Sequence, residues 1–278
     1  MGAIETNRLA LGAADAPNAA TMNHRVPFIA LFSTLATFGF AGLAAADTPV
    51  YELRTFTAHP GKHEAVLARF RDHTCKLFEK HGMTNVGYWE PTDADQDAGE
   101  KLYYLLGHKS REAGEAAFAA FGSDPEWQKV RDASEANGKI VASVESIFIT
   151  PTDYSASFNL KPGKATRVFE LRTYKTLPGR LPNLDARFRN HTCKLFAKHG
   201  MTNLGYFHPM DAGKGVGDTL IYFLAHDSRD AAKASWAAFQ ADPVWVAARD
   251  VSEADGKLLQ PRGVTFVFLK ATDFSAVK

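Results

Sequence analysis

The sequence predicts an α+β fold in which two tandem ferredoxin-like domains, each a split βαβ unit, pack as a pseudo-two-fold dimeric α/β barrel. Three observations point to this fold class. The chain repeats itself, each repeat alternates between strand and helix periodicity, and the order of these elements leaves one sheet face without helices. At 278 residues, the chain is long enough for two domains of ordinary size.

The internal repeat has an offset of 118 residues and runs without a gap from Val50 to Ile140. VYELRTF at 50–56 matches VFELRTY at 168–174, and RFRDHTCKLFEKHGMTNVGY at 69–88 matches RFRNHTCKLFAKHGMTNLGY at 187–206. A period this long describes two whole domains rather than the turns of a solenoid. We therefore expect a first domain over 47–156, a linker over 157–165 and a second domain over 166–278.

The elements of one repeat follow in a definite order. Alternating β-rich runs predict strands over 50–56, 83–89, 101–108 and 144–149. Apolar residues at helical spacing predict a helix from Lys62 to His81, where Gly82 ends it. Ser110 is placed to cap the next helix, and Asp124 followed by Pro125 splits that helix in two. This is the order of a split βαβ unit, whose sheet has helices on one face only.

The sheet face without helices decides how the repeats assemble. Such a face would expose apolar surface, so two units commonly pack face to face, and a duplication supplies both in one chain. The alternative is that each repeat pairs with another chain, which predicts a larger homo-oligomer.

An export signal precedes the repeats. From Met22 the sequence has Arg25, a mostly apolar run over 26–40, and three alanines ending at Ala46, which is the order of a secretory signal peptide. We expect 1–46 to be a signal peptide with an N-terminal extension, translation to start at Met22, and the mature chain to be periplasmic or secreted. A retained anchor is the alternative, but the run is short for the roughly 20 residues that a spanning helix needs. We expect no membrane span after cleavage.

Composition excludes several classes of protein. The formal charge of +1 gives no overall field to attract nucleic acid. The two cysteines make no CxxC motif and no cluster at zinc spacing, so the sequence indicates no metal and no cofactor.

Candidate site residues come from comparing the two copies. Along 101–108, alternate residues are the same in both copies, whereas Tyr103 and Leu105 become Ile221 and Phe223. We expect the exchangeable apolar residues to pack under the helices together with Leu53, and the unchanged residues to face the bare side of the sheet. The candidate ligand-binding residues are Glu52, Arg54, Asn85, Tyr104 and His108, with Glu170, Arg172, Asn203, Tyr222 and His226 in the second copy.

This cluster has two interpretations. Its arginine can orient an anionic or oxygen-rich ligand, and its histidine can move a proton. Alternatively, Glu52 and Arg54 pair across the barrel interface, and the tyrosine and histidine satisfy each other or the backbone. The cysteines, Cys75 and Cys193, fall opposite the apolar stripe of their helix, which predicts that they are exposed or lie at a second interface.

The runs YELRTF, HPGKHEAVLARF, KHGMTNVGYW, LYYLLGHKSREAGEAAFAAF, DPEW and PTDYS together resemble the NIPSNAP domain, and the second copy repeats nearly all of them. The resemblance covers almost the whole mature chain. It implies the dimeric α+β barrel fold, which antibiotic-biosynthesis monooxygenases, heme-degrading monooxygenases and chlorite-dismutase-like heme enzymes also use. It implies no catalytic residues. Eukaryotic members are described as mitochondrial proteins with interaction roles, and the export signal departs from that pattern.

The leading hypothesis is an exported protein that binds a small molecule inside the barrel, with catalysis left open. The rival is a non-catalytic interaction or structural module. A third reading, an oxygenase-like enzyme, rests on fold analogy alone.

Overall fold

The computed structural model describes residues 49–158, 160 and 167–278. The predicted signal peptide and most of the predicted linker lie outside these residues. Contacts divide the chain between Leu43 and Ala44, so every described residue belongs to one unit. No helix among the described residues is long and apolar enough to cross a membrane.

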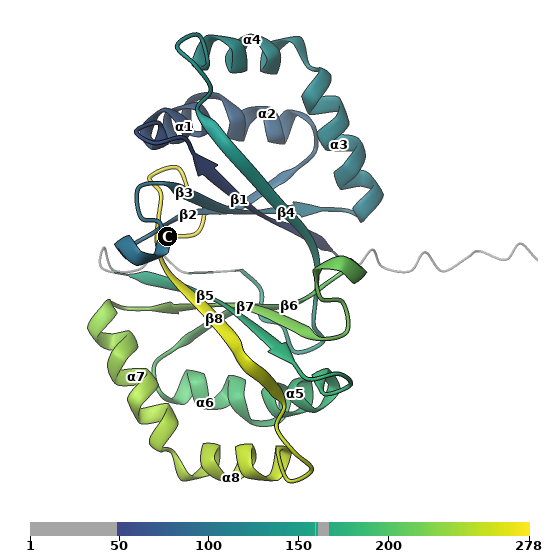
Figure 1. Ribbon diagram of the computed structural model, residues 1–278, viewed down its shortest axis with the longest axis vertical. Helices are drawn as coiled ribbons and strands as arrows, with labels where there is room; N and C mark the ends of the chain where they lie inside the picture. Colours follow the sequence, from purple (N-terminus) through teal and green to yellow (C-terminus); the bar gives the residue numbers. More distant parts are fainter. Residues whose placement is uncertain (1–48, 159, 161–166) are drawn as a thin grey trace, which may run out of the picture. The chain divides into compact units, whose positions relative to one another are not determined.

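Each repeat contributes four strands and four α-helices to this unit (Figure 1). The strands are β1 (Val50–Ala58), β2 (Thr84–Pro91), β3 (Lys101–His108), β4 (Val141–Pro151), β5 (Val168–Thr176), β6 (Thr202–Pro209), β7 (Thr219–His226) and β8 (Leu259–Ala271). The helices are α1 (His63–Arg69), α2 (Cys75–Lys80), α3 (Arg111–Ser123), α4 (Pro125–Ser134), α5 (Leu181–Arg187), α6 (Cys193–Lys198), α7 (Arg229–Ala241) and α8 (Pro243–Ser252). The strands predicted at 50–56, 83–89, 101–108 and 144–149 are therefore confirmed, with small differences at their ends.

The strands form one closed barrel in the order β1-β3-β2-β8-β5-β7-β6-β4, and all pairs are antiparallel. Two seams join the repeats: β2 pairs with β8 from Trp89 to Pro91, and β4 pairs with β6 from Ile149 to Pro151. Helices α1–α4 cover one side of the barrel and α5–α8 the other (Figure 1). The barrel thus closes within a single chain, and an α+β architecture is confirmed.

The C-terminal segment of each repeat crosses to the other repeat. Ser275 Oγ accepts a hydrogen bond from the backbone N–H of Tyr88 at 2.9 Å, and Ser155 Oγ accepts one from Tyr206 at 2.9 Å. The ring of Phe274 lies 5.3 Å from that of Tyr88. These exchanged segments satisfy backbone donors that would otherwise be buried without partners, so they hold the two halves together.

The predicted helix from Lys62 to His81 is interrupted. A π-helical turn, Phe70–Thr74, separates α1 from α2, and Phe188–Thr192 does the same between α5 and α6. Thr74 Oγ1 donates to the carbonyl of Arg69 at 3.1 Å within this turn. The predicted caps at Ser110 and Asp124 are confirmed, because their side chains accept the backbone N–H groups of Ala113 and Glu126.

Two kinds of apolar layer fill the unit. One cluster inside the barrel contains Leu53, Leu105 and Phe223, and it includes no helical residue. The other layers lie between the sheet and the helices of each half, and Tyr104 and Tyr222 are buried there. The face assignment made from the sequence is therefore wrong: Leu53 faces the barrel interior, and Tyr104 lies under the helices.

The reason lies in the packing of the two copies. Inside the barrel, a side chain of one copy meets side chains of the other, as Trp89 meets Phe223 at 5.3 Å between ring centroids. Such contacts need complementary shapes, so the interior residues of β3 and β7 differ. Under the helices each copy repeats the same local packing, so the alternate residues of these two strands stay the same. Exchangeable apolar residues therefore marked the interior rather than the helix layer.

Candidate functional site

Glu52, Arg54 and His108 form a buried cluster between β1, β3 and α3. Arg54 Nη1 donates to Glu52 Oε1 at 2.7 Å, and His108 Nε2 lies 3.3 Å from Glu52 Oε2. Ser146 on β4 also donates to this carboxylate. The Arg54 guanidinium lies over the Phe118 ring of α3, 4.2 Å from its centroid. The antiparallel pairing of β1 with β3 places these side chains on the helix-covered face rather than in the barrel.

The second copy has the same cluster with one donor exchanged. Arg172 donates to Glu170, and His226 Nε2 lies 3.0 Å from Glu170 Oε2. The position of Ser146 is taken by Phe266, and Trp236 Nε1 on α7 donates to Glu170 Oε2 at 2.8 Å instead. Each buried glutamate thus keeps three side-chain partners, although the third partner comes from a different element.

These partners keep both glutamates ionised. Burial alone raises the pKa of Glu52, but the hydrogen bond from His108 and the charge of Arg54 outweigh it and lower the pKa. The same balance lowers the pKa of Glu170. The pairing is within one repeat, not across the barrel interface as the structural interpretation proposed. Since the carboxylates are already fully engaged, the cluster stabilises the link between sheet and helix, and a ligand would have to displace these bonds.

The remaining predicted site residues lie elsewhere in the helix layer. Asn85 donates to the carbonyl of Cys75 at 2.9 Å and accepts from the Tyr88 hydroxyl, and Asn203 donates to the carbonyl of Cys193 at 3.0 Å. Tyr104 stacks on Tyr88 with ring centroids 5.4 Å apart. The structure therefore brings the Glu, Arg and His of each copy together but sets Asn85 apart, on the joint between β2 and α2.

Both cysteines are half-buried and pack against the helix-layer cores, so their predicted exposure is wrong. The π-helical turn adds a residue before each of them and rotates the following residues toward the sheet. Burial raises the pKa of each thiol to about 11. A thiol with this pKa is protonated at neutral pH and is a poor nucleophile.

The barrel interior holds a cavity of about 650 Å³ that opens to solvent at one end. Along β5, Leu171, Thr173 and Lys175 point to this cavity in turn, and they are buried, half-buried and exposed respectively. Leu53 and Thr55 repeat the pattern on β1. The cavity is therefore apolar at its base and polar toward its opening. The sequence did contain this signal, in the alternate residues that were assigned to the helix side.

Three lysines and one glutamate stand at the open end. Lys101, Lys175, Lys214 and Glu145 line the cavity together with Tyr103. Lys101 also pairs with an aspartate of the preceding loop, at 2.6 Å. Two further threonines, Thr219 and Thr265, contribute hydroxyl groups. The lining side chains thus carry an excess of positive charge, and hydroxyl groups stand next to it.

Phe158, Leu160 and Val277 close the opposite end of the barrel. The Phe158 ring lies 6.2 Å from Trp89 and 5.2 Å from Phe223, centroid to centroid. Val277, near the C-terminus, is 7% exposed and belongs to the interior cluster. A side chain at Gly205 would place its Cβ 2.6 Å from the Phe158 ring, so this strand position needs glycine. Among the described residues, these side chains block that end, so the interior is a blind cavity there.

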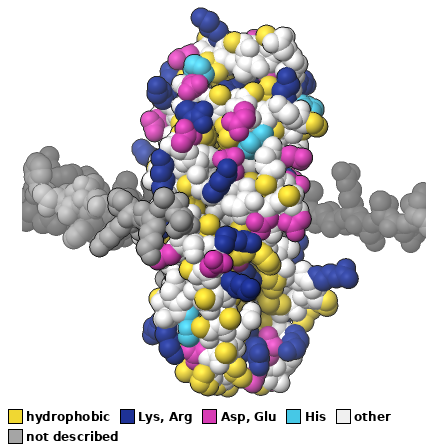
Figure 2. All heavy atoms as spheres, turned by 90° about the vertical axis from the view of Figure 1, so that its left-hand side faces the viewer, with side chains coloured by type: hydrophobic (Ala, Val, Ile, Leu, Met, Phe, Trp, Pro, Cys, Tyr) yellow, Lys and Arg dark blue, Asp and Glu magenta, His cyan; other side chains and the backbone are white. Residues whose placement is uncertain are grey.

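On the face shown in Figure 2, acidic and basic side chains are interspersed, and no region of one sign covers it. Among the described residues, no group of three or more His, Cys, Asp or Glu side chains is placed to hold a metal ion.

Comparison with known proteins identifies the fold and the family. No curated protein matches the chain. A Lactobacillus acidophilus protein provisionally named a monooxygenase is similar in structure, with TM-score 0.52, 12% identity, and coverage of 83% of this chain and 99% of its own. A Fusobacterium nucleatum protein named in the same way gives TM-score 0.53, 13% identity and coverage of 81% and 92%. A structure described as an anthrone oxidase-like protein gives TM-score 0.52, 16% identity and coverage of 84% and 95%. At these identities the likeness shows the fold alone.

The sequence profile of the NIPSNAP family matches residues 51–156 and 169–276, one match in each repeat. These two segments make up most of the described chain, and the resemblance noted in the sequence is confirmed. The chain therefore belongs to the NIPSNAP family.

Proposed function

We propose that this NIPSNAP protein is exported and binds a small amphipathic anion inside its barrel. The observation that carries the proposal is the blind cavity of about 650 Å³ with an apolar base and lysines at its opening. Ligand sites are commonly concave, mostly apolar and a few hundred cubic ångströms in volume, with a small number of polar groups that set orientation. The ligand is an apolar chain or ring system with one carboxylate or phosphate at its end.

The lining supports this polarity. Leu53, Leu171 and Ile221 are each at most 8% exposed, so an apolar body gains burial against them. Lys175 and Lys214 stand where the anionic end would emerge, and a charge-assisted hydrogen bond there is stronger than a neutral one. The Arg54 and His108 cluster takes no part in this proposal, because it lies on the other face of the sheet.

We also propose that the two halves correspond to the two subunits of a dimeric α+β barrel fused in one chain, with domains over 47–156 and 166–278. The two inter-repeat seams and the exchanged C-terminal segments support this.

The second candidate function is that of an interaction module, and the exposed face of α8 favours it. Its Val244 and Val251 are 52% and 79% exposed, where α4 has Glu126 and Ala133. An oxygenase activity is supported only by the names of the structures that share this fold.

The binding proposal is tested with dodecanoate, titrated calorimetrically into the mature protein, alongside native mass spectrometry of protein from the exported fraction. Thr173→Trp fills the cavity and is expected to weaken binding at least tenfold, roughly 1.4 kcal/mol or more. Added salt should weaken the binding of dodecanoate to the unmodified protein, because it screens the attraction to the lysines. Lys175→Glu is expected to bind more weakly, and its affinity should rise with added salt because salt then screens a repulsion. Lys233→Glu, on the outer helix α7, is the matched charge control and should bind as the unmodified protein does. Equal binding by Thr173→Trp and the unmodified protein would contradict a site in the barrel.

A further inference from the structure

A second, smaller cavity lies between the helices and the sheet of the second half. It has a volume of about 160 Å³, and its lining includes Phe188, Phe196, Phe239 and Trp245. An engineered apolar cavity of about 150 Å³ is known to hold benzene, so this volume accommodates one aromatic ring. The surrounding aromatic side chains offer edge and face contacts to such a ring. It is separated from the barrel cavity by the sheet itself.

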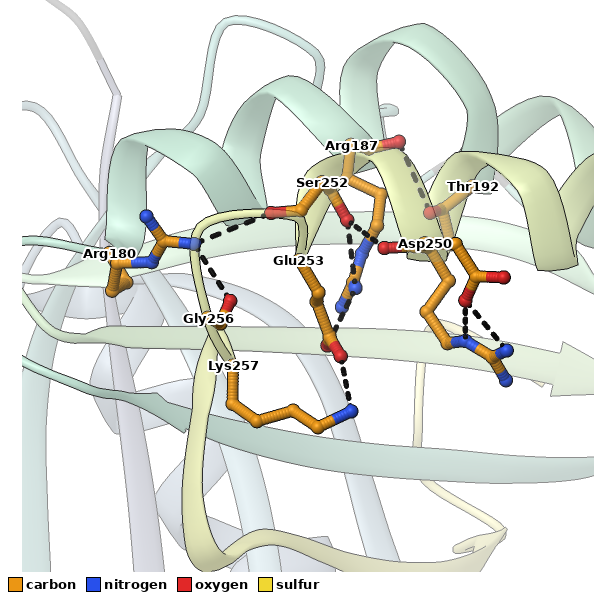
Figure 3. Close-up of polar contacts among 9 residues, drawn as sticks. Arg180, Arg187, Thr192, Asp250, Ser252, Glu253, Gly256 and Lys257 are labelled. Atoms are coloured by element: carbon orange, nitrogen blue, oxygen red, sulfur yellow. Dashed lines mark hydrogen bonds and ion pairs between the residues drawn. The ribbon is translucent and has the colours of Figure 1, made fainter.

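This cavity differs from a simple packing defect because a buried arginine lines it. Arg187 is 5% exposed, and its guanidinium lies 5.1 Å from the centroid of the Trp245 ring. Its Nη1 donates to Ser252 Oγ and to Glu253 Oε1, both at 3.3 Å, as Figure 3 shows. Arg187 Nε is buried and has no partner among the described residues. A buried guanidinium with an unused donor is costly unless something accepts from it.

The charge around Arg187 is incompletely balanced. Glu253, its carboxylate partner, also accepts from Lys257 Nζ at 2.8 Å, so one negative charge serves two cations (Figure 3). Arg249 lines the same cavity and is paired with Asp250, its neighbour in sequence, at 2.8 Å. The cavity lining therefore carries two arginines and one carboxylate, which Arg187 shares with the exposed Lys257, and an anion in the cavity would restore the balance.

Hydroxyl groups mark the other side of the site. Tyr174 lines the cavity, and its hydroxyl accepts from Arg172 Nη2 at 3.4 Å, which leaves its own proton to donate. The hydroxyl of Tyr222 is buried next to it, and the ring centroids of the two tyrosines lie 5.3 Å apart. The first half has Phe56 in place of Tyr174, so the Tyr174 hydroxyl belongs to the second half alone, whereas Tyr104 repeats Tyr222.

We propose that the cavity binds a small aromatic carboxylic acid of the benzoate class, with its ring among the phenylalanines and Trp245 and its carboxylate accepting from Arg187. Tyr174 donates a second hydrogen bond to the ligand. One molecule binds per chain, because the first half lacks the tyrosine. This site is independent of the barrel cavity and does not rest on the binding of an amphipathic anion there.

The test is a calorimetric titration of the whole protein with benzoate. Saturable binding with one site per chain is expected, and toluene, which lacks the carboxylate, should bind at least tenfold more weakly. Tyr174→Phe reproduces the residue of the first half and should weaken benzoate binding several-fold without harming the fold. Arg187→Gln should abolish it. Arg69→Gln removes the equivalent arginine of the first half, so it carries a similar cost to folding but should leave binding intact.

Several outcomes would overturn the proposal. These are the absence of saturable binding, two sites per chain, equal affinity for toluene and benzoate, or equal loss of binding in Arg187→Gln and Arg69→Gln. If Arg187→Gln does not fold, unchanged affinity in Tyr174→Phe together with equal binding of toluene is sufficient to reject it. Benzoate binding by the Thr173→Trp protein separates this site from the barrel cavity, because that substitution fills only the latter.

Discussion

Replacing Trp236 by phenylalanine isolates the hydrogen bond by which α7 contacts the buried carboxylate of Glu170. Trp236 Nε1 donates to Glu170 Oε2 at 2.8 Å, and Glu170 is 1% exposed. A hydrogen bond to a charged group contributes about 1.5 to 3 kcal/mol, and the carboxylate oxygen loses one partner when the donor is removed. The smaller ring also loses some packing, so the expected loss of stability is about 2 to 3 kcal/mol.

The first half supplies a specific rescue. There, phenylalanine at position 118 coexists with a buried glutamate because Ser146 donates to it. Phe266 occupies the equivalent position in β8 and is 47% exposed, so Phe266→Ser alone should cost little. The double variant, Trp236→Phe with Phe266→Ser, recreates the arrangement of the first half. It should recover about 1 kcal/mol or more of the loss, which is the coupling that a double-mutant cycle measures.

The assay is thermal unfolding at neutral pH, followed by circular dichroism. For a chain of this size, a loss of 2 to 3 kcal/mol lowers the melting temperature by about 4 to 12 °C. If Trp236→Phe has the same melting temperature as the unmodified protein, the hydrogen bond from the indole contributes nothing to stability. If the two substitutions are simply additive, the serine does not replace the indole, and the compensation deduced from the two halves is refuted.

Three further predictions follow from the same interactions. The pKa values of Glu52 and Glu170 are lowered in the folded protein, so their ion pairs stabilise it above the ordinary glutamate pKa. This stabilisation is lost as the pH falls through the lower folded pKa, so the midpoint of urea unfolding should fall in acid. A midpoint that does not change with acid would contradict this. Both thiols, with pKa values raised to about 11, should react with Ellman's reagent far more slowly in the native protein than in denaturant, and equal rates would place them at the surface. Ser275→Ala removes the acceptor of the buried Tyr88 N–H, so it should destabilise the protein by about 1 to 3 kcal/mol, measured by chemical denaturation. An unchanged denaturation midpoint would mean that water replaces the hydroxyl.

The sequence predicted the elements well because their signals are local. Ser110 and Asp124 cap helices through atoms two or three residues away, and strand alternation reports burial along a single segment. The interruption of the first helix was missed, since nothing in the apolar spacing of 62–81 separates a π-helical turn from a regular one. That one extra residue is also why Cys75 was placed on the wrong side of the helix.

The candidate site was predicted in part. Glu52, Arg54 and His108 do come together, because alternation places them on one face of neighbouring strands. Which face that is depends on contacts between the two halves. The divergence of alternate residues between the copies does mark those contacts, but it predicts the wrong face when it is read as packing under the helices. No sequence signal distinguishes Arg187. Its burial depends on α8 folding over it, and its first-half counterpart, Arg69, lies in the same local sequence and makes equivalent contacts.

Comparison of the two copies distinguishes structure from binding more sharply than either copy alone. Positions that are identical in both halves, such as the buried glutamate and its arginine, perform the same packing task twice. Among the buried positions that differ, some lie where the halves meet, as Leu105 and Phe223 do, and others lie where one half has changed its surroundings, as Phe56 and Tyr174 do. A residue retained in both copies is therefore not by itself evidence for a site. A ligand that occupies one half only should depend on at least one residue that differs between the copies, as the proposed benzoate site depends on Tyr174 as well as on Arg187.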